Sequence, residues 1–146
     1  MDQFKRSRLE WRQGFSVGIS RIDDQHRGMI DALNEIGLAM EDGDTEGCDR
    51  LFGKFLDLSR DHFESEEKVL FASGYPKAQE HADYHRQLLA MAEKAREQCR
   101  QLMAANQMDE CFNSLLEFLI GDLLEADIQF KSFLEEMDAA NRSGLN

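Results

Sequence analysis

Residues 51–66 read LFGKFLDLSRDHFESE. Side chains in this segment recur every three or four residues along one face, as in an amphipathic helix; that stripe consists of Leu51, Phe55, Leu58, His62 and Glu66. A histidine and a carboxylate therefore continue a stripe that is otherwise apolar. Because a buried carboxylate is costly unless it is paired or binds a metal, the segment predicts both a helix and a polar site in the interior.

Three more stretches have helical periodicity, and short polar or glycine-containing breaks separate the four. The expected breaks are residues 42–44, 73–75 and 105–107. Short connections make neighbouring helices antiparallel, so we predict an all-α fold, an antiparallel up-down-up-down four-helix bundle. No segment alternates apolar and polar residues as a half-buried strand does.

The expected helix ends carry their own signals. Asp23 or Asp24 could cap the first helix, and Asp44 or Thr45 could open the second. Pro76 suits the first turn of the third helix, where a missing backbone N–H does no harm. The fourth helix is expected to continue without interruption through its apolar residues, which are Phe112, Leu115, Leu119, Leu123, Phe130 and Phe133.

The domain organisation is predicted to be simple. Residues 1–22 lack a helical pattern and are expected to form an irregular N-terminal arm that lays apolar side chains over the core. Residues 132–146 extend the last helix or begin a linker. The 146 residues are the length of one ordinary domain, so we expect a single domain over residues 1–146.

The charge balance is strongly acidic, with 29 Asp and Glu against 17 Lys and Arg and a net charge of −12. Binding to nucleic acid or to an anionic membrane surface needs clustered basic residues, so both are excluded as functions. No apolar run is long enough to predict a transmembrane helix, and no apolar segment behind the N-terminus predicts a secretory signal.

The three cysteines are Cys48, Cys99 and Cys111, and no CxxC pair occurs. An odd number without this spacing predicts neither a disulfide framework nor a thiolate zinc site. We therefore expect reduced, buried thiols and a cytoplasmic location.

The four histidines all fall on inward-facing positions, on three different expected helices. His62 continues the stripe quoted above, His81 and His85 share a face four residues apart, and His26 lies one turn before an apolar stripe. Asp127 lies among apolar residues in the same way as Glu66. Taken singly, a histidine on an apolar face is most often an ordinary core residue.

The agreement of three helices predicts a metal site instead. Nitrogen donors with one or two carboxylates suit iron, zinc or copper, whereas magnesium and calcium prefer oxygen alone. The segment from His81 to His85 lacks the glutamate of the HExxH zinc proteases, and the chain has no Glu-x-x-His of the ferritin-like di-iron proteins.

Five motifs occur along the chain: WRQGFSVGI at residues 11–19, IDDQH at 22–26, HFESEE at 62–67, GYP at 74–76 and HADYH at 81–85. Together they resemble the bacterial hemerythrins, and the resemblance runs from about Trp11 to about Phe130. The resemblance implies two non-haem iron ions (Fe²⁺/Fe³⁺) with an oxo or hydroxo bridge. It further implies that His26 and His62 bind the iron with an open position for dioxygen, that His81 and His85 bind the other iron, and that Glu66 and Asp127 bridge the two.

One position departs from the family pattern. Hemerythrins have a fifth histidine ligand five residues before the bridging aspartate, and this chain has Asp122 there. Asp122 either replaces the imidazole as a terminal ligand on the iron held by His81 and His85, or points away and leaves that iron with two histidines and water. An additional anion stabilises the higher oxidation state, so ligation predicts a lower reduction potential and faster autoxidation.

The resemblance implies reversible binding of dioxygen, and nitric oxide is a second gas that such a centre could take. An oxidation-prone centre suits an oxygen or redox sensor with a fused or associated signalling output domain. Oxygen storage or transport is the first alternative. A di-iron peroxidase or oxidase is the second, although no additional acid–base residue is placed for catalysis, and we expect weak peroxidase activity at most.

Overall fold

The computed structural model describes residues 10–12, 15–104, 108–120 and 127–142. Within these residues the chain forms helices and no strand, which confirms the predicted all-α fold. The helices are α1 (Ser20–Glu41), α2 (Thr45–Ala72), α3 (Ala78–Ala104), α4 (Met108–Ile120) and α5 (Asp127–Arg142).

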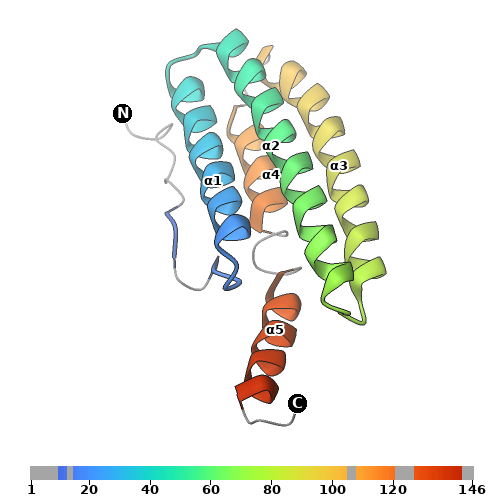
Figure 1. Cartoon of the computed structure of the whole chain (residues 1–146). Coiled ribbons are helices and arrows are strands. Elements are labelled where there is room, and N and C mark those ends of the chain that lie inside the picture. Colours follow the sequence, from blue (N-terminus) through green and yellow to red (C-terminus); the bar gives the residue numbers. More distant parts are fainter. Residues whose placement is uncertain (1–9, 13–14, 105–107, 121–126, 143–146) are drawn as a thin grey trace.

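The first four helices form the predicted up-down-up-down bundle (Figure 1). Helix α1 contacts α2 and α4, and α3 contacts the same two helices, so the four close into a ring around one core. Helix α5 lies at one end of this bundle, next to the start of α1 and the connection between α2 and α3 (Figure 1).

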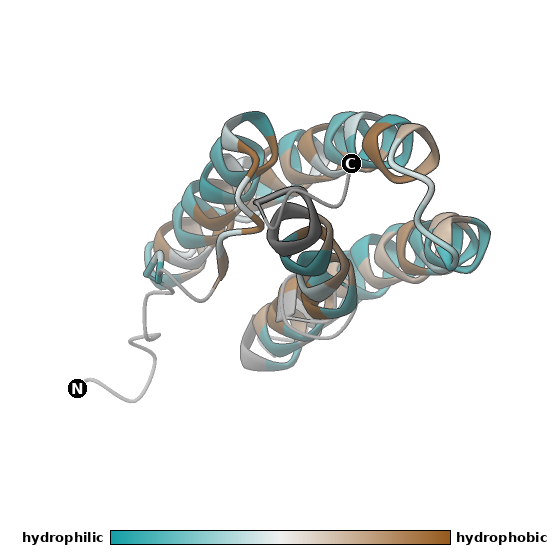
Figure 2. Cartoon of the chain, turned by 60° about the horizontal axis from the view of Figure 1, so that its bottom comes forward, coloured by the Kyte–Doolittle hydropathy of each residue, from teal (hydrophilic) through white to brown (hydrophobic). Residues whose placement is uncertain are grey.

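The core is formed by the apolar stripes that the sequence predicted. Figure 2 shows that the hydrophobic faces of the helices are largely turned toward one another and the hydrophilic faces outward. The largest apolar side chains with almost no exposed surface are Phe52, Phe55, Phe63, Phe130, Ile22, Met29, Leu33, Ile36, Leu70, Leu115 and Leu119. Each such side chain stabilises the fold by about 1.5–3 kcal/mol relative to leaving it in water.

The described part of the predicted N-terminal arm, residues 10–12 and 15–19, packs on this core, whereas residues 20–22, also expected in the arm, belong to α1. Phe15 and Val17 are buried, and Trp11 packs against the core cluster. The ring of Trp11 contacts the ring of Phe15 edge-on. The guanidinium carbon of Arg27 in α1 lies over the face of the Trp11 ring, 4.3 Å from its centroid. The arm is therefore attached to α1 by apolar and cation–π contacts.

Helices α1 and α2 end in the same way, and both ends confirm predicted breaks. Gly43 and Gly74 follow the two helices with positive φ angles of 72° and 74°, a conformation that glycine adopts without strain. The residue after each glycine donates its N–H back to a carbonyl in the last turn, from Asp44 to Ala39 and from Tyr75 to Leu70. These bonds satisfy carbonyls that the helix itself leaves without a partner.

The predicted start of the first helix was wrong by three residues. Helix α1 begins at Ser20, and Ile19 precedes it without a side-chain capping bond. Asp23 bonds instead to the arm, where its carboxylate accepts from the backbone N–H of Val17 at 2.9 Å and from the hydroxyl of Ser16 at 2.6 Å. A short polar side chain near a helix start can serve the preceding segment as well as the helix, and here it fixes the arm.

At the next two helix starts, one prediction was confirmed and one was wrong. Asp44 caps α2 by accepting a hydrogen bond from the backbone N–H of Gly47 at 2.9 Å. Pro76 lies in the turn before α3, which begins only at Ala78. The backbone N–H of Ala78 bonds back to Tyr75, so a tight turn occupies the position expected for the first helical turn.

The predicted uninterrupted fourth helix is described as two helices, α4 and α5. Residues 121–126, which lie between them, are outside the described residues. The expected continuity of the fourth helix across residues 121–126 therefore stays a prediction.

The expectation of reduced thiols was wrong for two of the three cysteines. Cys99 of α3 and Cys111 of α4 form a disulfide whose Cα atoms are 5.0 Å apart, while Cys48 is free and buried. The two residues are twelve positions apart on antiparallel neighbours, so the end of α3 lies against the start of α4 and brings the sulfurs together. An odd cysteine count carries no signal for a contact of this kind.

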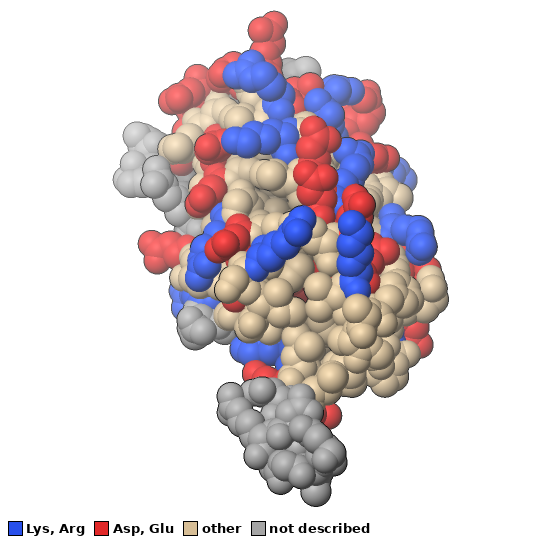
Figure 3. Space-filling model, in the orientation of Figure 1, with Lys and Arg blue, Asp and Glu red and all other residues tan. Residues whose placement is uncertain are grey.

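Charged side chains of both signs are interleaved over much of the face in Figure 3 and become sparse toward its lower end. Phe71, the second-last residue of α2, is 53% exposed. None of the described helices is both long enough and apolar enough to cross a membrane.

Candidate metal centre

Six side chains that can bind a metal meet at one end of the bundle. His26 comes from α1, His62 and Glu66 from α2, His81 and His85 from α3, and Asp127 from the first position of α5. All six are buried, and His81 is the most exposed at 7%. The structure therefore brings together six of the seven predicted site residues, and the seventh, Asp122, lies outside the described residues.

The antiparallel bundle explains why these residues meet. His26 lies near the start of α1, His62 and Glu66 near the end of α2, and His81 near the start of α3. In antiparallel neighbours the end of one helix lies beside the start of the next, so all these positions fall at the same level. The spacing of four residues from His62 to Glu66, and from His81 to His85, then keeps each pair on one helix face.

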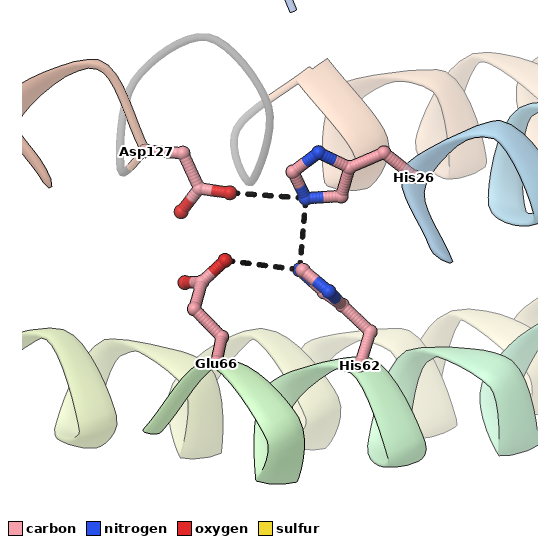
Figure 4. A group of neighbouring side chains, drawn as sticks. All are labelled: His26, His62, Glu66 and Asp127. Atoms are coloured by element: carbon pink, nitrogen blue, oxygen red, sulfur yellow. Dashed lines mark hydrogen bonds and ion pairs between the residues drawn. The ribbon is translucent and has the colours of Figure 1, made fainter. Parts of the chain in front are cut away.

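The first group consists of His26, His62, Glu66 and Asp127 (Figure 4). The Nε2 atoms of His26 and His62 lie 2.9 Å apart. Nε2 of His26 is 3.0 Å from Oδ2 of Asp127, and Nε2 of His62 is 3.3 Å from Oε2 of Glu66. Both imidazoles thus turn the same ring nitrogen toward one point, where the two carboxylates also face.

The second group shares both carboxylates and consists of Glu66, His81, His85 and Asp127. Nε2 of His81 lies 2.6 Å from Oε1 of Glu66 and 3.1 Å from Oδ1 of Asp127. Nε2 of His85 lies 3.2 Å from the same Oε1 of Glu66. This second pair of imidazoles also uses Nε2 to face the centre.

The two oxygens of each carboxylate face different histidine pairs. Oε2 of Glu66 faces His62, whereas Oε1 faces His81 and His85. Oδ2 of Asp127 faces His26, whereas Oδ1 faces His81. Two carboxylates that each extend one oxygen to either side form the arrangement expected of ligands that bridge two cations.

These spacings fit metal ions. Two ligand atoms that bind one ion at right angles, each about 2.1 Å from it, lie about 3.0 Å apart. The contacts within the two groups run from 2.6 to 3.3 Å. Two imidazole nitrogens 2.9 Å apart form a hydrogen bond only if one of them is protonated, whereas a cation between them engages both lone pairs.

The electrostatics of the metal-free site are those of a buried ion pair. Burial by itself raises the pKa of Glu66, but hydrogen bonds from His81 and His85 and the nearby charges hold that pKa well below its ordinary value. Burial lowers the pKa of His81, while hydrogen bonds to Asp127 and Glu66 raise it to about 10. A proton on His81 thus neutralises part of the negative charge in the centre when metal is absent.

Further residues around the centre contact the histidines. His62 donates from Nδ1 to Oε1 of Gln25 at 3.2 Å, and His85 donates from Nδ1 to Oε2 of Glu67 at 3.2 Å. The ring of Phe63 stacks on the imidazole of His85 with centroids 4.0 Å apart. Sequence reasoning did not assign these roles; the available signal was that Gln25 and Glu67 directly neighbour His26 and Glu66.

Comparison with known proteins agrees with this site. The hemerythrin HHE cation-binding domain matches residues 17–138. The chain belongs to the hemerythrin family. A bacteriohemerythrin from Stenotrophomonas maltophilia is 30% identical over 77 residues, which cover 53% of this chain and 50% of that protein. A bacteriohemerythrin from Pseudomonas aeruginosa (strain LESB58) is 25% identical over 77 residues, with the same coverage.

A more distant relative matches over more of the chain. A myohemerythrin from Theromyzon tessulatum is 20% identical over 125 residues, which cover 86% of this chain and 92% of that protein. By contrast, this hemerythrin-family chain spans about half the length of the two bacterial relatives that it matches. The family membership and the six converging side chains make it a hemerythrin-like cation-binding domain.

Proposed function

We propose that this hemerythrin-family chain holds two non-haem iron ions and binds dioxygen at them. His26 and His62 would bind one ion, His81 and His85 the other, and the two carboxylates would bridge them. The observation that carries the proposal is the orientation of Glu66, whose two oxygens face opposite histidine pairs. A site for one ion does not require the two oxygens of one carboxylate to face different pairs of histidines.

Iron bound there would supply reversible binding of dioxygen, as the membership of the hemerythrin family supports. The protein's part is to hold the ligands and to exclude water. The core cluster includes Phe55, Phe63 and Phe118, and the ring of Phe118 contacts each of the other two edge-on. Such a lining limits the access of water and ions and lets a small apolar gas occupy the site.

The experiment that tests this proposal is reconstitution with Fe²⁺ under anaerobic conditions. We expect about two iron ions per chain, and a visible charge-transfer absorption that appears in air and disappears when oxygen is removed. The exposed Glu64, replaced in Glu64→Ala, provides a control that leaves the metal content unchanged. One iron per chain, or stoichiometric zinc without visible absorption, would contradict the proposal.

We further propose that the chain serves as an oxygen or redox sensor. The support is the sequence position of Asp122, which places a carboxylate where the family has its fifth histidine. If Asp122 binds the iron held by His81 and His85, its charge favours the oxidised state. An oxygenated form that persists for many hours at room temperature would contradict this role and favour storage or transport.

A signalling partner and the gas preference belong to the same proposal. A sensor has to pass its state to an output domain, whether fused or associated. Comparing dioxygen with nitric oxide in the reconstituted protein, by the change in its visible spectrum, measures the preference directly. The cytoplasmic location predicted from the sequence stays a prediction.

A further inference from the structure

We propose that Gln25 and Glu67 are positioning residues that fix His62 and His85 and make the two metal positions electrostatically unequal. The inference rests on the proposed two-ion site and goes beyond it. It assigns roles to two residues that bind no metal themselves. A neutral amide supports His62 in the first group, and a carboxylate supports His85 in the second.

Gln25 fixes His62 through a two-step hydrogen-bond chain. Its Oε1 lies 3.2 Å from Nδ1 of His62, and its Nε2 donates to Oγ of Ser65 at 3.0 Å. An amide oxygen can only accept, so Nδ1 of His62 must carry the hydrogen. The other ring nitrogen, Nε2, then presents its lone pair to the centre, as a metal ligand requires.

Glu67 fixes His85 in the same way but with a charge. Its Oε2 lies 3.2 Å from Nδ1 of His85, and a carboxylate also only accepts, so Nδ1 of His85 carries the hydrogen. The side chain of Glu67 is 29% exposed, whereas that of His85 is 1% exposed. Glu67 therefore keeps contact with solvent while it supports a buried ring.

The two supports differ in charge, and this difference makes the metal positions unequal. A carboxylate behind an imidazole increases the basicity of the ring and stabilises positive charge on the metal beyond it. The position of His81 and His85 has such a carboxylate, while the amide of Gln25 supports that of His26 and His62. We expect the iron at His81 and His85 to lose an electron more readily.

The first test reads the hydrogen bonds in the protein loaded with two Zn²⁺, by proton NMR of the Nδ1–H groups. We expect protected, downfield signals from both His62 and His85, with that of His85 further downfield because its acceptor is charged. Gln25→Leu should move only the His62 signal, and Glu67→Leu only the His85 signal. Zinc affinity at the affected position should fall about 10–100-fold.

The second test separates the charge from the hydrogen bond. Glu67→Gln keeps an acceptor for His85 and removes the charge, so it should lower zinc affinity less than Glu67→Leu does and raise the reduction potential of the iron-loaded centre. Gln25→Glu adds a charge behind His62 and should lower the potential. Glu64→Gln and Gln87→Glu make the same chemical changes at exposed sites and should leave the potential unchanged.

Failure of the positioning roles can be distinguished from failure of the two-ion proposal. Wild-type stoichiometry is measured first, and binding of fewer than two ions would contradict the proposed function itself. If two ions bind but Gln25→Leu and Glu67→Leu leave the Nδ1–H signals unmoved, the positioning roles are wrong. If Glu67→Gln shifts the potential no more than Glu64→Gln does, the electrostatic inequality is wrong.

Discussion

Among single residues, Glu66 matters most for the proposed two-ion site, because it belongs to both ligand groups. Its side chain has no exposed surface, and imidazoles from two helices surround it. A carboxylate in such a place is unfavourable unless it is paired or binds a metal. The sequence predicted its burial and its partnership with the histidines. It could not predict which oxygen faces which ring, because that depends on the side-chain torsions and on how the helices pack.

Replacing Glu66 should affect both metal positions at once. Glu66→Ala removes a ligand that both groups share, so the iron content should fall well below one ion per chain. His85→Ala removes a ligand of the second group alone and should leave about one ion bound. Metal analysis after dialysis against a weak chelator measures both values. Retention of one ion by Glu66→Ala would show that the carboxylate does not bridge.

The protonation of His81 should make the metal-free protein depend on pH. The pKa of His81 rises from its ordinary 6.5 to about 10, so the stabilisation from its ion pairs is complete below pH 6.5 and is lost toward pH 10. The lowered pKa of Glu66 makes stability depend on pH in the opposite direction, because the stabilisation from its ionised carboxylate is lost as pH falls below 4.5. The free energy of unfolding should therefore decrease between pH 6.5 and 9.5, by on the order of 2 kcal/mol.

Urea unfolding of the metal-free protein at several pH values measures this trend. His81→Gln removes the titrating group and should flatten the profile over the same range. Zinc affinity should rise with pH in the wild type, because the metal displaces the proton of His81. A wild-type profile as flat as that of His81→Gln would contradict the assigned charge state.

Asp122 is the residue at which this chain departs from its family. If Asp122 binds iron, Asp122→His should slow autoxidation, because the variant then exchanges an anionic ligand for a neutral one. The decay of the oxygenated spectrum in air measures the rate. Asp57→His makes the same change at an exposed position of α2 and should leave the rate unchanged. Equal rates for wild type and Asp122→His would mean that Asp122 does not bind iron.

Among the elements, apolar periodicity predicted the bundle helices and the breaks at residues 42–44 and 73–75, while the break expected at 105–107 lies outside the described residues. Phe55, His62 and Glu66 of the predicted stripe are buried. Asp44 caps the start of α2, and Gly74 with its positive φ follows the end of that helix. Two features could not be predicted from apolar periodicity. The start of α1 depends on how the arm folds back onto Asp23, and the disulfide depends on which residues of α3 and α4 lie opposite each other.

The disulfide should stabilise the pairing of α3 with α4 without contributing to the metal site. The double variant Cys99→Ser/Cys111→Ser should lower the free energy of unfolding by about 2–4 kcal/mol, mainly because the unfolded chain regains freedom. Urea unfolding with and without reductant measures the change. Cys48→Ser is the matched control. If reductant leaves the wild-type midpoint unchanged, the disulfide does not contribute.

At the scale of the whole molecule, the centre joins parts of the chain that are far apart in sequence. Residues from α1, α2, α3 and α5 all contribute, and a small apolar cluster next to the centre packs α5 against the α2–α3 end. That cluster contains Leu70, Tyr75, Ala78 and Phe130. Metal binding should therefore stabilise the entire fold and not one helix alone.

The expected stabilisation follows from mass action. Metal at 100 times its dissociation constant should raise the free energy of unfolding by about 2.7 kcal/mol per independent site. Thermal unfolding with increasing zinc should show a rising midpoint and a single cooperative transition. Two separate transitions, one of them insensitive to zinc, would mean that the metal organises only part of the bundle.

The most direct test of the central claim is an anomalous diffraction map of the iron-loaded protein at the iron absorption edge. We expect two peaks about 3.5–4 Å apart. One peak should lie beside His26 and His62 and the other beside His81 and His85, with Glu66 and Asp127 between them. A single peak, or two peaks that do not share these carboxylates, would contradict it.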